Sequence, residues 1–314
     1  MAGHPFSDYV GRFAPSPTGP LHFGSLIAAL ASFLQARTRG GRWLLRIEDI
    51  DQPRVVPKAT EWILRSLKAH GLEPDGPPLY QSQHQPAYRE ALAQLQQQGL
   101  VYACACTRRA IRDAAPLGPY GAIYPGTCRQ QRLPWHHGYA IRLRTDNRAW
   151  GFTDRLQGHF SQRLAAEVGD FVLRRSDGLF AYQLAVVVDD HAQGITEIVR
   201  GADLLDSTPR QCYLQHCLGL PTPEYLHLPV AIAPCGTKLS KQTGAPGLDD
   251  AKAPAQLCAA LTHLGHPPPL GALRASVDEI LQWALAHWEP QRIPAQRTLP
   301  APQTATLANQ GHAP

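Results

Sequence analysis

Residues 11–25 read Gly-Arg-Phe-Ala-Pro-Ser-Pro-Thr-Gly-Pro-Leu-His-Phe-Gly-Ser, and this stretch decides the fold. It starts inside an apolar segment, Tyr9 to Ala14, that is typical of a buried strand. A loop rich in proline and glycine follows, and an apolar segment from Leu26 to about Gln35 predicts a helix. The N–H groups and the dipole at a helix N-terminus attract an anion. His22 adds a ring donor, and Gly24 lets a ligand approach the backbone closely, so the stretch predicts an anion site.

A second strand is predicted directly after this helix. Gly40-Gly41 ends the helix, and Arg-Trp-Leu-Leu-Arg-Ile at 42–47 has the pattern of a buried strand. A strand, a helix and a strand between residues 9 and 47 predict a βαβ unit, and hence a parallel sheet in an α/β fold. Ligands of such sheets bind beyond the carboxyl ends of the strands, where both the first loop and Glu48 lie.

The bulk properties exclude some classes of protein. The chain has 314 residues, 44% of them hydrophobic, which is enough for one large folded domain or two ordinary ones. A net charge of +5 is compatible with a polyanionic partner. No segment reaches the roughly 18 apolar residues of a membrane span, and residues 1–10 lack the regions of a signal peptide. We therefore expect a cytoplasmic protein without a membrane partner.

Three of the seven cysteines cluster in the sequence and suggest a metal site. An odd number of cysteines, without the regular spacing of a disulfide framework, argues against a disulfide scaffold. Cys104 and Cys106 suit one metal ion better than a disulfide, and Cys128 offers a third thiolate. Structural zinc takes four ligands, usually Cys or His. The nearby candidates for the fourth ligand are Tyr124, His136 and His137. A histidine is the more common ligand, because phenolate is rare and the tyrosine hydroxyl has a high pKa.

Further elements follow from periodicity and turn residues. The run at 180–191 begins like a helix and ends in β-branched residues, so its type is open. The strand at 195–201 ends in Arg200, again at a carboxyl edge. Residues from Pro290 onward have little periodicity and several prolines, and we expect them to be disordered. Helices are expected at 57–71, 86–99, 204–218, 254–264 and 277–288, and strands at 79–82, 100–103, 139–146, 151–154, 169–173 and 227–232.

The opening stretch resembles the HIGH signature of class I aminoacyl-tRNA synthetases, and Pro-Ser-Pro-Thr-Gly before the histidine resembles their glutamyl branch. The passages at 44–51, 182–191 and 199–204 resemble the same branch, and Lys-Leu-Ser-Lys at 238–241 is similar to its KMSKS loop. The resemblance implies a Rossmann-like catalytic domain at 1–102 and 189–250. It also implies an inserted α+β subdomain with a zinc site at 103–188, a short helical region at 251–289 and a disordered tail at 290–314.

The resemblance also implies the roles of the site residues. His22, Lys238 and Lys241 would be catalytic, and His22, Gly24, Ser25 and Lys241 would bind ATP, with Mg²⁺ on its phosphates. Glu48 would hold the ammonium group of glutamate. The residues expected to contact glutamate are Arg12, Phe13, Ala14, Pro15, Ser16, Glu48, Tyr182 and Arg200, and the residues do not tell which arginine takes the side-chain carboxylate.

Two features resemble the glutamyl-Q tRNA(Asp) synthetases more closely. Their Cys-x-Cys…Tyr-x-x-x-Cys pattern matches Cys104, Cys106, Tyr124 and Cys128, which implies one structural Zn²⁺ per chain with Tyr124 as a ligand. Only residues 243–314 follow the lysine loop, so no anticodon-binding domain is expected.

That family is a group of ATP-dependent ligases. They activate L-glutamate without tRNA and transfer it to the queuosine base in the anticodon of tRNA(Asp). We expect this activity in a monomer. The alternatives are a short glutamyl-tRNA synthetase that charges the 3′ end of tRNA(Glu) or tRNA(Gln), and a non-catalytic relative that binds RNA or an amino acid.

Overall fold

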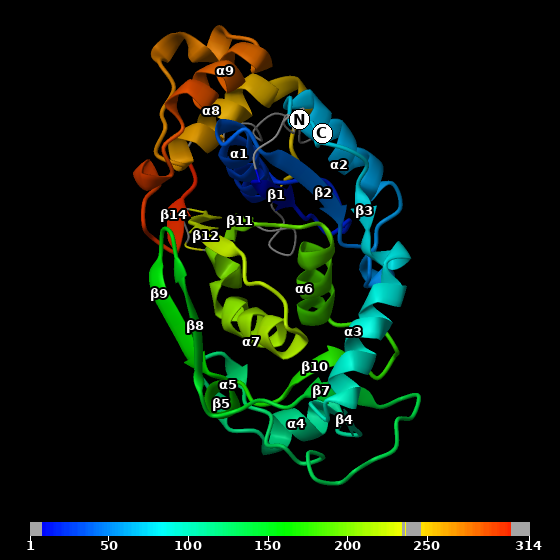
Figure 1. Cartoon of the computed structure of the whole chain (residues 1–314). Helices are drawn as coiled ribbons and strands as arrows, with labels where there is room; N and C mark the ends of the chain where they lie inside the picture. The colour runs from blue at the N-terminus through cyan, green and yellow to red at the C-terminus, as the bar shows by residue number, and fades with distance from the viewer. Residues whose placement is uncertain (1–7, 234–235, 237–245, 303–314) are drawn as a thin grey trace, which may run out of the picture.

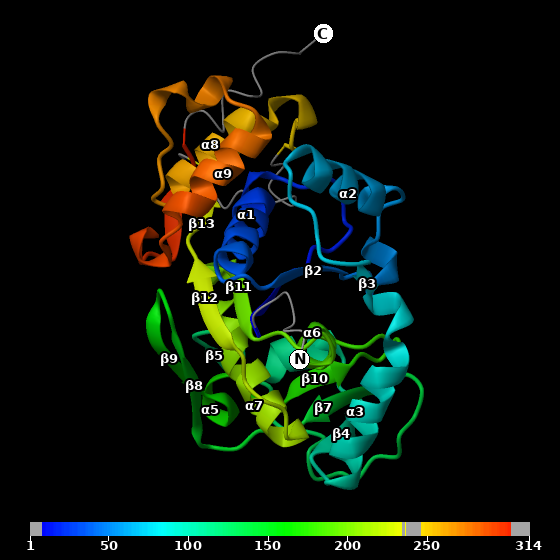
Figure 2. The same ribbon diagram turned by 45° about the horizontal axis from the view of Figure 1, so that its top comes forward.

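The computed structural model describes residues 8–233, 236 and 246–302. Parallel strands lie at its centre, an antiparallel part lies on one side of them and a helical part on the other (Figure 1, Figure 2). In the described ranges, no helix has both the length and the apolar character that crossing a membrane requires.

The central strands are parallel, as predicted. β1 (Val10–Phe13), β2 (Arg42–Ile47) and β3 (Leu79–Tyr80) pair in that order. β11 (Glu197–Gly201) and β12 (Glu224–Leu228) form a second parallel pair. This pair begins beside β1, because the N–H of Thr196 donates to the carbonyl of Val10 at 2.9 Å. The carboxyl ends of β1, β2 and β11 therefore meet around one site.

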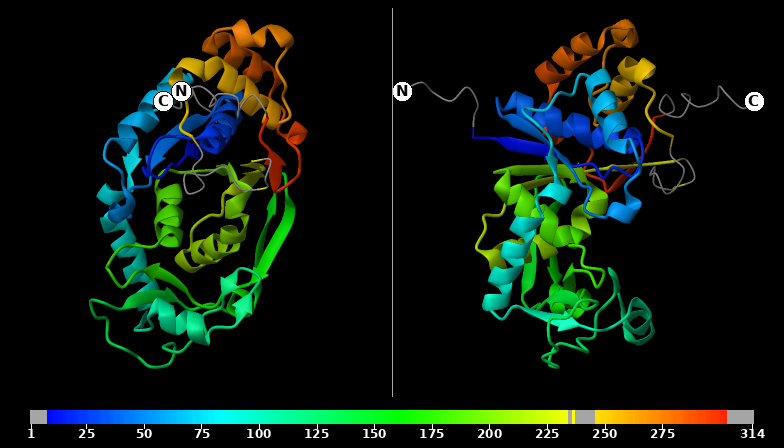
Figure 3. Two further views of the ribbon diagram at one scale, coloured as in Figure 1. Left: turned by 180° about the vertical axis from the view of Figure 1, so that it is seen from behind. Right: turned by 90° about the vertical axis from the view of Figure 1, so that its right-hand side faces the viewer.

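Helix α1 (Phe23–Thr38) is the centre of the main core. It lies between the parallel strands and two C-terminal helices (Figure 3). Leu26, Leu30 and Leu34 are almost wholly buried there. The chain returns to β2 through Gly41, where a Cβ atom would come within 2.4 Å of the carbonyl oxygen of Tyr9. Only glycine fits this close approach, which holds the βαβ unit together.

The inserted part is antiparallel. β4 (Val101–Cys104), β7 (Ala140–Leu143) and β10 (Phe171–Arg174) pair in the order β10-β7-β4, so the α+β character expected of this region is present. The remaining elements of this part are the hairpin of β8 (Ala149–Asp154) and β9 (Gly158–Arg163), helix α4 (Arg108–Ala114), helix α5 (Leu164–Glu167), and the short strands β5 (Leu117–Gly118) and β6 (Gly121–Ala122).

Helices join the two kinds of sheet. The ambiguous run at 180–191 is helical, as α6 (Tyr182–Ala192), because its apolar side chains pack on several sides at once. The other connecting helices are α2 (Ala59–Ala69), α3 (Gln85–Gln97) and α7 (Thr208–Leu218), and the short turns η1 (Gln52–Arg54), η2 (Gln81–Gln83) and η3 (Ala202–Ser207).

The prediction of disorder from residue 290 onward is wrong for residues 290–302. η7 (Pro290–Arg292) is followed by β14 (Thr298–Pro300), which pairs in parallel with β13 (Val230–Ile232). A strand of three residues that pairs with a distant partner leaves no periodic signal in the sequence. The other elements of this part are α8 (Ala253–His263), α9 (Val277–His287), η5 (Asp250–Lys252) and η6 (Leu270–Arg274).

Candidate active site

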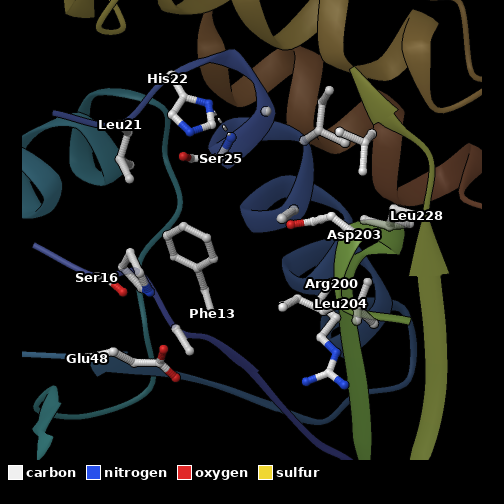
Figure 4. A pocket seen from close by; sticks show the side chains of 18 of the residues that line it. Phe13, Ser16, Leu21, His22, Ser25, Glu48, Arg200, Asp203, Leu204 and Leu228 are labelled. Carbon is white, nitrogen blue, oxygen red and sulfur yellow. Dashed lines mark hydrogen bonds between the residues drawn. The ribbon is translucent and has the colours of Figure 1, made fainter. Parts of the chain in front are cut away.

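A cavity of about 530 Å³ opens where the carboxyl ends of β1, β2 and β11 meet the N-terminus of α1. Figure 4 shows Glu48 and Ser16 on one side of it, Arg200 on the other, and His22 and Ser25 at the start of α1. Lys238 and Lys241 lie outside the described residues. The predicted residues that line the cavity are Arg12, Phe13, Ala14, Pro15, Ser16, His22, Gly24, Ser25, Glu48, Tyr182 and Arg200.

His22 is the N-cap of α1. Its backbone is extended, and its Nδ1 accepts a hydrogen bond from the N–H of Ser25 at 3.3 Å. A neutral imidazole that accepts at Nδ1 carries its proton on Nε2. The cap therefore fixes the tautomer in which Nε2 is a donor, as a phosphate oxygen requires.

Glu48 follows β2 directly, and its N–H donates to the carbonyl of Pro15 at 3.0 Å. Its side chain is 10% exposed, and Nη2 of Arg46 lies 3.4 Å from its Oε1. Burial raises the pKa of Glu48, an effect that the charges of Arg46 and Arg12 oppose. A carboxylate in this position attracts a ligand ammonium group, whose positive charge would stabilise the ionised form of Glu48.

Arg200 is buried, and neutral groups surround its guanidinium. Nε donates to Nε2 of His227 at 3.1 Å, and Nη2 donates to Thr208 and Gln211, both at 2.8 Å. Nη1 lies 3.4 Å from the hydroxyl oxygen of Tyr182, which it donates to. Among the described residues, no carboxylate pairs with Arg200, so neither Asp203 nor Asp189 neutralises it there. A buried cation with neutral neighbours is costly unless a ligand supplies an anion.

His227 stays neutral beside this cation. Burial lowers the pKa of His227 to about 4, against the opposing influence of Asp154, whose Oδ2 lies 2.6 Å from Nδ1. Asp154 itself has a lowered pKa: burial would raise it, but the bond with His227 prevails. The proton of His227 therefore sits on Nδ1, and its Nε2 lone pair faces Arg200. Sequence reasoning placed His227 at a strand start but missed this role.

Arg12 contrasts with Arg200 because it has an internal carboxylate partner. Its Nε donates to Oδ1 of Asp190 at 3.1 Å. The same oxygen accepts from Nη1 of Arg46 at 2.7 Å, and both arginines are buried. Burial would raise the pKa of Asp190, but Arg46 and Arg12 outweigh it and lower that pKa. Arg12 is therefore already neutralised before any ligand binds.

Arg46 is the functional residue that sequence reasoning missed most clearly. It is wholly buried, and it contacts Asp190, Gln193, Glu48 and, at 3.9 Å from Nε, Asp189. Burial lowers the pKa of an arginine, yet these carboxylates raise that of Arg46 overall. The sequence did contain a signal for this role: Arg46 lies inside the apolar strand at 42–47, and a buried charge needs a partner of opposite charge.

Asp189, next to Asp190 on α6, contacts side chains of η2 and α3. Its carboxylate accepts from Gln81 at 2.8 Å and from the hydroxyl of Tyr88 at 2.7 Å, and it lies 2.6 Å from Nδ1 of His84. The sequence signal for this role was the position of Asp189 and Asp190 directly after the apolar residues of the run at 180–191. Together they fix α6, and hence Tyr182 at its start, against β2.

The three cysteines converge in the inserted part. The Sγ atoms of Cys104, Cys106 and Cys128 all lie within 4.8 Å of one another. The hydroxyl oxygen of Tyr124 lies 3.2 Å from Sγ of Cys104 and 3.7 Å from Sγ of Cys106. Among the described residues, no His, Asp or Glu ligand atom joins this group, which leaves out the described His136 and His137. Three sulfur atoms and the hydroxyl oxygen of Tyr124 make a group of four donor atoms, the number that a tetrahedral metal site needs.

A nearby arginine favours the ionised form of Cys104, whereas burial raises the pKa of Cys106 and of Tyr124. Nε of Arg142 donates to Sγ of Cys104 at 3.3 Å, and its guanidinium lies 3.8 Å from the ring centroid of Tyr124. Burial opposes ionisation of Cys104, but the bonds from Tyr124 and Arg142 prevail and lower its pKa. A thiolate is the form that binds a metal.

Comparisons with known proteins agree with this geometry. A family model described as "tRNA synthetases class I (E and Q), catalytic domain" matches residues 9–254. A glutamyl-Q tRNA(Asp) synthetase of Dechloromonas aromatica is 55% identical over 298 residues, covering 94% of this chain and 99% of the relative. One of Ectopseudomonas mendocina is 54% identical, covering 93% and 97%. A glutamate tRNA ligase of Elizabethkingia meningosepticum, solved in complex with its amino acid, superposes with a TM-score of 0.79 at 27% identity, covering 97% of this chain and 69% of its own.

Proposed function

The chain belongs to the class I tRNA synthetases of the E and Q type, and we propose that it activates L-glutamate with ATP and transfers it to the queuosine base of tRNA(Asp). The observation that carries the first step is that one cavity holds both a largely buried carboxylate, Glu48, and a buried cation, Arg200, which has no carboxylate partner among the described residues. The names of the relatives support the RNA target.

Glutamate fits the charges of this cavity. Glu48 takes the α-ammonium group. Arg200 takes the side-chain carboxylate, because Arg12 already has Asp190, whereas the partners of Arg200 within the described ranges are neutral. Tyr182 accepts from Arg200, so its own proton is available to donate to the same carboxylate. Arg12 and Ser16, which line the same cavity, bind the α-carboxylate next to the start of α1.

In the activation step, an oxygen of the α-carboxylate attacks the α-phosphorus of ATP. The new P–O bond gives glutamyl-adenylate, and the bond to pyrophosphate breaks. His22 donates from Nε2 to a phosphate oxygen, and the N–H groups at the start of α1 stabilise the same charge. From the sequence resemblance, Lys238 and Lys241 stabilise the leaving pyrophosphate, and Mg²⁺ accompanies ATP.

In the transfer step, a hydroxyl of the cyclopentene-diol of queuosine attacks the carbonyl carbon of the adenylate. An ester bond forms, AMP leaves, and the hydroxyl proton passes to solvent or to the phosphate group of the leaving AMP. Since this base belongs to an anticodon loop, it must leave the stack to reach the cavity.

Zinc has a structural place in this proposal. Cys104, Cys106, Cys128 and Tyr124 would hold it, and a bound ion would tie residues 106–128 to the end of β4. Its chemistry is to cross-link the chain, as in other closed thiolate sites.

ATP–pyrophosphate exchange tests the activation step. We expect glutamate-dependent exchange without any RNA. Absence of exchange both with and without tRNA contradicts the proposal. A tRNA(Asp) that lacks queuosine separates the transfer from 3′-end charging, since labelled glutamate attached to that RNA would favour a short glutamyl-tRNA synthetase instead.

A further inference from the structure

A cation at the mouth of the cavity has no role in either step described above. Arg54 lines the cavity, but it is exposed, at the end of η1. In the part of the chain that the structure describes, neither an ion pair nor a side-chain hydrogen bond engages its guanidinium. Lys58, four residues further on, is also exposed and is likewise without a described partner. Two available cations thus lie on one short segment.

This segment is held firmly at the cavity. The N–H of Val56 donates to the carbonyl of Pro17 at 2.9 Å, which ties residues 52–58 to the loop before α1. At its other end, Nη1 of Arg175 lies 3.2 Å from Oδ1 of Asp51. Arg54 therefore sits between the first loop and the inserted part, on the rim of the cavity.

The acidic residues next to Arg54 are already engaged. Asp49 accepts from the N–H and the hydroxyl of Ser82, at 2.8 and 2.6 Å. Asp51 pairs with Arg175, and Glu48 points into the cavity beside Arg46. None of them neutralises Arg54, so the rim presents positive charge to an approaching ligand.

We propose that Arg54, assisted by Lys58, binds the RNA backbone phosphates next to the nucleotide that enters the cavity. This inference rests on the proposed function. When a base leaves its stack and enters a pocket, its own sugar and the flanking phosphates stay outside, at the mouth. An exposed guanidinium there can bind a phosphate in bidentate geometry. In the proposed activation step the start of α1 binds the phosphates of ATP, so Arg54 at the rim is available for the RNA.

The test compares activation with transfer in Arg54→Ala and Arg54→Lys. The control is Arg65→Ala, because Arg65 is an exposed arginine on α2 that pairs with Asp250 at 2.9 Å outside the cavity. Exchange with glutamate and ATP measures activation and folding together. Single-turnover transfer to queuosine-containing tRNA(Asp), at several salt concentrations, measures the RNA contact.

For Arg54→Ala we expect exchange within about twofold of the unmodified chain and a half-saturating RNA concentration roughly tenfold higher. The slope of log affinity against log salt should be shallower by about one, and Arg54→Lys should recover part of the loss. Unchanged transfer, or a raised KM for ATP in exchange, would overturn the inference. Failure of the proposed function itself is distinct, since the unmodified chain would then transfer no glutamate at all.

Discussion

Nε of Arg200 donates to Nε2 of His227 at 3.1 Å, so in the part of the chain that the structure describes a buried cation is held by a neutral base and not by a carboxylate. Asp154 makes this arrangement possible, because its carboxylate accepts a hydrogen bond from the Nδ1–H of His227 and leaves the Nε2 lone pair for Arg200. The positive charge of Arg200 is therefore oriented without being cancelled. This relationship explains how the cavity can select a second carboxylate on its amino acid.

Replacing Arg200 should remove that selection. We expect Arg200→Met to lower kcat/KM for glutamate in exchange by about 30-fold or more, because a charge-assisted buried contact contributes on the order of 2–5 kcal/mol. The KM for ATP should change little. Asp203→Asn, at the next acidic position on the cavity wall, serves as the control. Equal discrimination between glutamate and glutamine in the unmodified chain and Arg200→Met would contradict the assignment.

His227 should make stability depend on pH. Its pKa is about 4 in the folded chain and about 6.5 when unfolded, so the unfolded chain binds a proton first as the pH falls. This contribution is complete above pH 6.5 and is lost toward pH 4. Urea unfolding should show that His227→Gln weakens the drop in unfolding free energy between pH 7 and pH 5 by about 2 kcal/mol. An equally steep drop in the variant would refute it.

Arg46 should set the ionisation of Glu48. Burial raises the pKa of Glu48 and Arg46 counteracts this, so Arg46→Lys, which cannot reach Asp190 and Glu48 together, should raise it further. We expect the acid limb of kcat/KM for glutamate to move to higher pH, with an unchanged KM for ATP. Arg42→Lys is the matched control, at the exposed start of the same strand. An acid limb that stays in place would show that Arg46 is only structural.

Metal content tests the cysteine cluster. We expect one zinc per chain, lost in Cys106→Ser and removed more easily by a chelator in Tyr124→Phe. His136→Ala and His137→Ala should keep their zinc, because these histidines lie outside the cluster. Equal zinc in Cys106→Ser and the unmodified chain, by elemental analysis, would rule the site out. If His136→Ala loses zinc while Tyr124→Phe keeps it, the assignment of Tyr124 as the fourth ligand is wrong.

The sequence predicts those site residues that are marked by the local pattern of the segment in which they lie. Glu48 follows the strand predicted at 42–47, Arg200 lies near the end of the strand predicted at 195–201, and His22 lies in the loop before the helix predicted from Leu26. Their meeting at one edge therefore followed from parallel topology. Contacts between distant segments were not accessible in this way. The partners of Arg46 on α6 lie far along the chain, and the role of His227 depends on Asp154 in the inserted part. The pairing of β14 with β13 was missed for the same reason.

The most direct test of the central claim is mass spectrometry of the anticodon fragment of tRNA(Asp) after incubation with glutamate, ATP and the chain. The account predicts that the queuosine nucleotide gains the mass of one glutamyl group, while the 3′-terminal fragment is unchanged. A glutamyl group on the 3′ end, with an unmodified anticodon fragment, would contradict it.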